Sequence, residues 1–196
     1  MIIISSGFNE IGNTQLTLQL EKAIHENPKI SVIGPNCLGV LATRSGVDTL
    51  FLPNYRMERP HPGKISFISQ SGALGSAILD WASFKEYGIS KFISFGNATQ
   101  TDEADLLEYL GNDTDTLVIA VYVEGFKNGK KFFEIAKKVT QKKPVILIKG
   151  GITEAGAKAT TSHTGSLAGD FEVVKAMAKQ ANITLAHSME EVFDYA

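Results

Sequence analysis

The sequence has very little cysteine, no long apolar run and almost no net charge. Its one cysteine, Cys37, excludes a disulfide within the chain and fits a reducing compartment. Apolar runs such as 116–123 are far too short to cross a bilayer as a helix, and the apolar residues 1–4 lack the basic flank of a secretion signal. A net charge of −2 gives no electrostatic reason to bind nucleic acid or an anionic membrane. We therefore expect a cytoplasmic protein that binds neither.

Metal-binding patterns are also missing. The 4 histidines have no spacing typical of metal ligands, so no protein-bound metal is predicted. With 43% apolar and 20% charged residues, the composition is that of an ordinary globular protein. A chain of 196 residues can form one complete core and part of a second.

From residue 64 onward, short apolar runs alternate with amphipathic helical patterns. The runs predict strands over 65–68, 92–95, 116–123, 145–148 and 183–185, and the patterns predict helices over 71–86, 102–110, 128–141 and 171–180 and after Ser188. This alternation predicts an α/β fold with a doubly wound parallel sheet of the flavodoxin-like strand order 2-1-3-4-5.

The first part of the chain is different. A strand over 1–4, a helix over 14–25 and a strand over 30–33 suit a parallel βαβ unit, but two strands alone make no stable parallel sheet. Residues 36–63 show no clear periodicity and are predicted to be an extended linker. Its charged residues are expected to be solvated: Arg56, Glu58, Arg59 and His61.

A polar stretch over 150–169 connects the strand 145–148 to the helix 171–180 and carries His163 near its end. Most connections in compact domains have about four to six residues, and much longer ones are usually functional or disordered. A lone histidine in a loop is more often a surface residue. Its functional interpretation depends on which side chains lie at the neighbouring strand ends.

Two other strand ends carry suitable chemistry. After 65–68, Ser69-Gln70-Ser71-Gly72-Ala73 starts a helix, and the free N–H groups of a helix start bind anions, although an ordinary N-cap fits equally well. After 116–123 comes Glu124, which is either solvated or able to orient an imidazole. A histidine, an orienting carboxylate and an anion site at one sheet edge are what a phosphohistidine relay needs.

The sequence resembles the NDP-forming acyl-CoA synthetases, which include the ADP-forming acetate–CoA ligases, and more distantly the alpha subunit of succinyl-CoA synthetase. The matching stretches run in the family's order along nearly the whole chain and include GPNCLGV (34–40) and SFGNATQTDEADLLEYL (94–110). The most specific are SHTGSLAG (162–169) and the upstream SQSGALG (69–75).

The resemblance implies a reaction in which acyl-CoA, phosphate and NDP interconvert with the free acid, CoA and NTP. It implies that His163 carries the phosphoryl group and that Glu124 holds this histidine. By the same motif matches, phosphate is bound by Ser69, Ser71, Gly72 and Ala73, and CoA by Asn36 and Cys37. Asn97 and Asp102 lie in the next strand–helix turn of the family, with a less defined role.

The resemblance also implies a division of the chain and a set of partners. Residues 1–43 match the tail of a Rossmann-like CoA-binding domain, 44–63 the linker and 64–196 the succinyl-CoA synthetase-like flavodoxin-type domain. The ATP-grasp domain, which binds nucleotide with Mg, is not in these residues. We therefore expect a fragment of a ligase that depends on an ATP-grasp beta subunit or domain, uses CoA, phosphate and a small carboxylic acid as substrates, and forms a hetero- or homo-oligomer.

Two other functions stay open at this point. A serine hydrolase could use Ser71 as nucleophile, but the nucleophile elbow reads G-x-S-x-G and here Ser69 and Ala73 replace its glycines. A non-catalytic or regulatory CoA-binding fragment is the second alternative.

Overall fold

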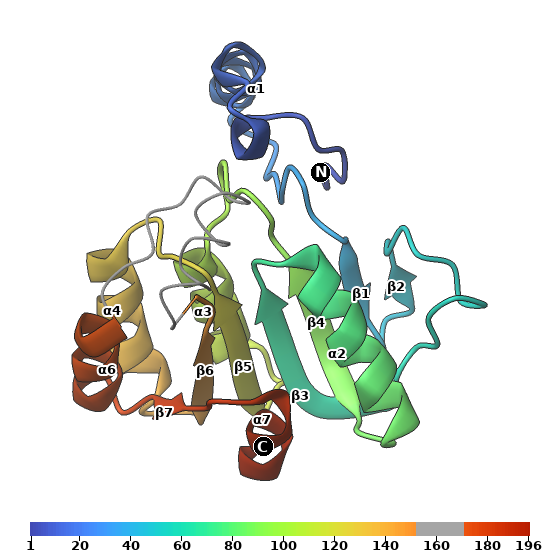
Figure 1. Ribbon diagram of the computed structural model, residues 1–196, viewed down its shortest axis with the longest axis vertical. Coiled ribbons are helices and arrows are strands. Elements are labelled where there is room, and N and C mark those ends of the chain that lie inside the picture. The colour runs from blue at the N-terminus through green and yellow to red at the C-terminus, as the bar shows by residue number, and fades with distance from the viewer. Residues whose placement is uncertain (152–170) are drawn as a thin grey trace.

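The computed structural model describes residues 1–151 and 171–196 of the chain. A seven-stranded sheet in the order β2-β1-β4-β3-β5-β6-β7 forms its centre (Figure 1). Its parallel strands are β3 (Pro62–Ser69), β4 (Ile89–Ser94), β5 (Val118–Val123), β6 (Val145–Lys149) and β7 (Thr184–Leu185). The order β4-β3-β5-β6-β7 confirms the predicted flavodoxin-like arrangement.

Helices cover both faces of this sheet. Figure 1 shows α2 (Gly72–Phe84) and α7 (Met189–Tyr195) in front of it. One apolar cluster joins these two helices to the sheet, and a second joins the opposite face to α3 (Glu103–Asn112), α4 (Gly129–Val139) and α6 (Phe171–Gln180). Strands buried on both faces explain why the strand segments read as continuous apolar runs.

Local capping chemistry fixes several helix starts. Asp102 caps α3 in a complete capping box with Asp105, and the side chains of Asn128 and Ser188 cap α4 and α7. Each of these side chains accepts a hydrogen bond from an N–H group of the first helical turn, which has no partner within the helix. The predicted starts at 102, 128 and after 188 therefore lie within one residue of the observed ones.

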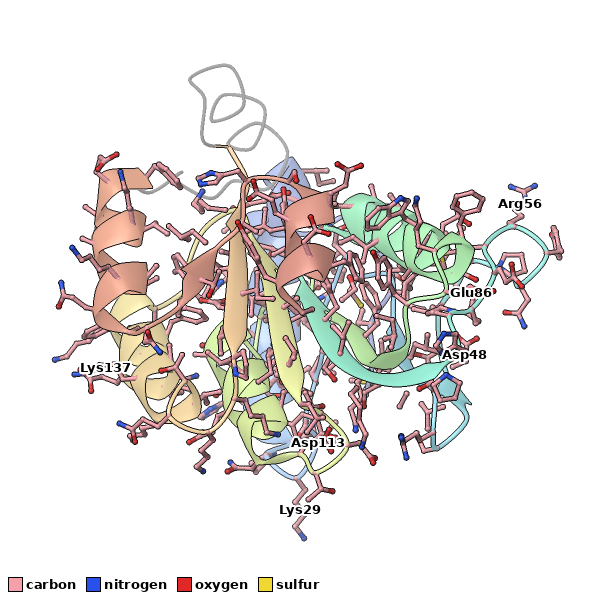
Figure 2. The ribbon with its side chains drawn as sticks, turned by 90° about the horizontal axis from the view of Figure 1, so that it is seen from below. Lys29, Asp48, Arg56, Glu86, Asp113 and Lys137 are labelled. Carbon is pink, nitrogen blue, oxygen red and sulfur yellow. The ribbon has the colours of Figure 1, made fainter. Side chains whose placement is uncertain are left out.

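The segment expected to be an extended linker is partly built into the sheet. β1 (Val40–Ala42) pairs antiparallel with β4, and β2 (Val47–Asp48) pairs with β1. The expectation of solvated charges is wrong for Arg59, whose guanidinium pairs with Asp48 at 2.8 Å and also donates to the carbonyls of Leu52 and Met57. Arg56, in contrast, points away from the body of the molecule (Figure 2). The division into 1–43, 44–63 and 64–196 stays a prediction.

The N-terminal segment lies beyond one end of the sheet (Figure 1). It contains the short helix η1 (Asn9–Ile11) and α1 (Thr14–Glu26), and none of the residues of α1 is buried. The two strands predicted over 1–4 and 30–33 are reduced to a single parallel bridge between Ile2 and Ile33. None of the helices among the described residues is long and apolar enough to span a membrane.

Candidate functional site

The parallel register aligns the ends of the central strands. Ser69 pairs with Ser94 on one side and Tyr122 on the other, and Val123 pairs with Lys149. The residues that follow these strands therefore leave the sheet at one common edge. In open α/β sheets, ligands bind at this edge, outside the carboxyl ends of the strands.

The start of α2 follows β3 after only two residues. The Ser71 hydroxyl accepts a hydrogen bond from the Leu74 N–H at 3.3 Å, so Ser71 is the N-cap. Gly72 and Ala73 supply N–H groups of the first turn, which have no acceptor within a helix. Ser69 is fully buried, and its hydroxyl donates to the Ser71 carbonyl at 2.7 Å. Ser69 thus shapes the turn, while Ser71 and the two residues after it form its accessible side.

Glu124 follows β5, and its main chain is tied to the end of β3. The side-chain carbonyl of Gln70 accepts hydrogen bonds from the N–H groups of Glu124 at 2.7 Å and Gly125 at 3.2 Å. The Tyr122 hydroxyl lies 3.5 Å from Glu124 Oε1, as a weak donor to it. Burial and, second, the charge of Glu124 raise the pKa of Tyr122 to about 12, so this phenol stays a neutral donor at physiological pH.

The N-terminal segment supplies the opposite wall. Asn36 lies at positive φ, and its amide donates to Asn97 Oδ1 at 3.1 Å, which links it to the turn after β4. Asn97 in turn donates to Glu10. Burial raises the pKa of Cys37 to about 11, so its thiol is protonated at neutral pH.

One cavity of about 510 Å³ collects most of the predicted site residues. Its lining includes the CoA candidates, the accessible part of the helix start and the carboxylate, namely Asn36, Cys37, Ser71, Gly72, Ala73 and Glu124, together with Gln70. Ser69 is not part of the lining. His163 lies outside the described residues. The helix start and Glu124 therefore line one cavity.

Asp102 has a structural role. It is 7% exposed, caps α3 and accepts hydrogen bonds from the Lys131 ammonium at 3.0 and 2.9 Å. Among the residues described by the structure, no group of three or more histidine, cysteine or acidic side chains could hold a metal ion.

Sequence reasoning did not assign a role to Gln70, Tyr122 or Lys149, all of which contact Glu124. Each stands within two residues of the end of a predicted apolar strand. A polar side chain close to the end of an apolar strand was the signal in the sequence that could have identified these residues.

Curated proteins of known function resemble the whole chain. It is 42% identical over 196 residues to "Acetate--CoA ligase [ADP-forming] I" of Archaeoglobus fulgidus, covering 100% of this chain and 28% of that protein. It is also 42% identical to "Acetate--CoA ligase [ADP-forming] I subunit alpha" of Pyrococcus furiosus, covering 99% of this chain and 41% of that subunit. The chain therefore spans less than half the length of either relative.

A solved structure agrees with this similarity. The dinucleotide-forming acetyl-coenzyme A synthetase 1 of Ca. Korarchaeum cryptofilum, in complex with phosphate and ADP, superposes with a TM-score of 0.89. It is 39% identical to the chain, and the match covers 98% of this chain and 41% of that one. Residues 62–196 match the family model described as "Succinyl-CoA ligase like flavodoxin domain". The chain thus belongs to the family of succinyl-CoA ligase-like flavodoxin domains.

Proposed function

We propose that the chain is the alpha-type module of an NDP-forming acid–CoA ligase and carries its phosphohistidine. The observation that carries this proposal is one cavity lined by both Glu124 and the start of α2. Family membership and the names of the relatives, which are ADP-forming acetate–CoA ligases, support the same reaction class.

The reaction divides into three transfers. Phosphate attacks the thioester carbon of acyl-CoA and releases CoA, which leaves an acyl phosphate. An imidazole nitrogen of His163 then attacks the phosphorus and releases the free acid. Finally, the terminal phosphate oxygen of NDP attacks the phosphohistidine, which gives NTP and restores the histidine.

Each group at the sheet edge has a role in this scheme. Glu124 accepts a hydrogen bond from one nitrogen of His163 and leaves the other nitrogen free to attack. The N–H groups of Gly72 and Ala73 and the Ser71 hydroxyl hold the phosphoryl oxygens at the positive end of the helix dipole. Ser69 fixes the turn that presents them. Asn36 and Cys37 border the space for the thiol end of CoA.

The final transfer needs a nucleotide site, which we assign to an ATP-grasp beta subunit or domain with its Mg-bound nucleotide. The relative from Pyrococcus furiosus is named as an alpha subunit, which supports a second subunit in this family.

A labelling experiment tests the proposal. The chain is incubated with ³²P-labelled acetyl phosphate and, separately, with γ-³²P-ATP and the ATP-grasp subunit from the same source. Acid-labile, base-stable label that is lost in His163→Ala and kept in the surface control His25→Ala supports the phosphohistidine. Unchanged label in His163→Ala, or no label from either donor, overturns it, and the second result favours a regulatory CoA-binding fragment.

The serine hydrolase alternative has less support. The Ser71 hydroxyl is used as an N-cap, and none of the histidines that the structure describes, at positions 25, 61 and 187, lines the cavity. Covalent modification of Ser71 by a fluorophosphonate would favour that alternative.

A further inference from the structure

A buried lysine ends the apolar strand β6. The strand reads VILIK, and Lys149 is 3% exposed. Burying an ammonium group is unfavourable unless hydrogen bonds and nearby charge compensate for lost water. An apolar residue at this position would avoid that cost, so the contacts of this lysine need an explanation.

The ammonium of Lys149 bridges two strand ends. Its Nζ donates to the carbonyl of Glu124 at 2.7 Å and to the carbonyl of Gly150 at 2.5 Å. The N–H of Gly150 donates to the carbonyl of Val123 at 2.8 Å. The turn after β5 and the first residue after β6 are thereby held together.

Glu124 is held on both sides of its own Cα. Gln70 accepts from its N–H and Lys149 donates to its carbonyl, so the two flanking peptide planes are fixed by buried or half-buried side chains. With both planes fixed, the direction of the Cα–Cβ bond is fixed too. The carboxylate can then reach the cavity from one defined position.

The charges of the two side chains also interact. Burial lowers the pKa of Lys149, and the nearby Glu124 carboxylate acts in the opposite direction. The Glu124 carboxylate thus offsets part of the cost of burying the ammonium.

The opposite end of β6 offers a natural comparison. Lys143 lies just before the strand, and its Nζ donates to the carbonyls of Leu110 at 2.7 Å and Asp113 at 2.5 Å. Burial lowers its pKa as it does for Lys149. The two lysines thus make the same kind of contact, but Lys143 does so at the sheet edge away from the cavity.

We propose that Lys149 is a positioning residue for Glu124, which fixes the main chain from which the carboxylate extends. This inference rests on the proposed function. Lys149 is not among the residues that line the cavity, and it acts through the main chain of Glu124.

The test compares Lys149→Met with Lys143→Met, which removes the same charge and the same number of carbonyl contacts. The measured quantity is the rate of His163 labelling by ³²P-labelled acetyl phosphate at saturation, normalised to the folded fraction. We expect Lys149→Met to lower this rate about 10- to 100-fold, the size expected for misaligned reacting groups. Lys143→Met should keep the wild-type rate even where it lowers the stability.

A double-mutant cycle separates positioning from a general loss of structure. If Lys149 acts through Glu124, Lys149→Met causes no further loss of rate in a Glu124→Gln background. The half-saturating concentration of acetyl phosphate should stay near wild type, because the start of α2 is unchanged. Should Lys149→Met not fold, Lys149→Gln, which keeps an uncharged donor, takes its place in both comparisons.

Two outcomes overturn the inference. One is a wild-type rate in the folded Lys149 variant, and the other is an equal fold-loss in the presence and absence of the Glu124 carboxylate. Both leave the proposed function intact, which fails instead when the wild-type chain shows no label on His163.

Discussion

The side-chain carbonyl of Gln70 accepts a hydrogen bond from the backbone N–H of Glu124 at 2.7 Å, across 54 residues of sequence. This bond joins the end of β3 to the end of β5 and places the carboxylate beside the start of α2. It makes the geometry of the cavity depend on a residue that carries no chemistry of its own.

Replacing Gln70 by methionine should lower both stability and labelling. The substitution keeps the length of the side chain but leaves the N–H groups of Glu124 and Gly125 without their acceptor, which costs about 1–3 kcal/mol. Urea unfolding measures the free energy, and the acetyl phosphate assay measures the rate. Gln141→Met, at an exposed position, is the control and should change the free energy by less than about 0.5 kcal/mol. Equal effects of the two substitutions would contradict the prediction.

Gly96→Ala should disturb the wall formed by the N-terminal segment. Gly96 has a φ of +56°, and a Cβ atom there would clash with the backbone oxygens of Pro35 and Asn36. Gly46 has a φ of +70° with no atom within 4 Å, so Gly46→Ala isolates the conformational cost, about 1–2 kcal/mol. Gly96→Ala adds a packing cost of about 1–3 kcal/mol, visible in urea unfolding. It should also weaken CoA binding, measured by calorimetry, because Asn36 lines the cavity. Similar losses of stability in both variants would show that the contact of residue 96 with Pro35 and Asn36 adds no packing cost.

The partly buried ion pair between Lys91 and Asp113, 2.7 Å apart, should make stability depend on acid pH. Burial alone would raise the pKa of Asp113, but hydrogen bonds from Lys91 and Thr116 outweigh it, so the pKa is lowered from 3.8. Because the unfolded chain binds this proton more readily, the stabilisation is complete above that ordinary value. It is lost as the pH falls through the lower folded-state pKa.

Lys91→Met should therefore lower the free energy of unfolding at pH 7 by about 1.5–3 kcal/mol, with the difference from wild type shrinking in acid. Urea titrations from pH 7 to pH 2 measure it. Lys22→Met breaks an exposed pair with Glu26, whose side chains are 76% and 60% exposed, and should have little effect at any pH. A difference for Lys91→Met that is independent of pH would be inconsistent with this account.

Cys37 should react slowly in the folded protein. Its pKa of about 11, against an ordinary 9.0, lowers the thiolate fraction at pH 8 about 100-fold, and the thiolate is the reactive form. Alkylation by iodoacetamide, followed by mass spectrometry, should therefore be at least that much slower than in urea-unfolded chain. CoA should slow it further if Cys37 borders the CoA site. A native rate within a few fold of the unfolded rate would contradict the assigned burial.

Local sequence signals determined much of the fold. The apolar runs located the five parallel strands, and the expected helix over 171–180 coincides with α6. Caps such as Asp102 and Asn128 act within a single turn, so their consequence can be inferred from neighbouring residues. The strand order followed because crossover connections in parallel sheets allow few alternatives. Glu124 and the start of α2 could be placed at one edge for the same reason.

The tertiary structure decided what depends on contacts between distant residues. β1 is a strand only because the free edge of β4 accepts it, since its own sequence has no strand periodicity. Arg59 is partly buried because Asp48 and two carbonyls converge on it. The Gln70 and Lys149 contacts that fix Glu124 join residues 54 and 25 positions apart. The sequence by itself thus determined which chemical groups stand at the edge of the sheet. Only folding decided how they are held, because hydrogen bonds between strand ends exist only once the strands are aligned.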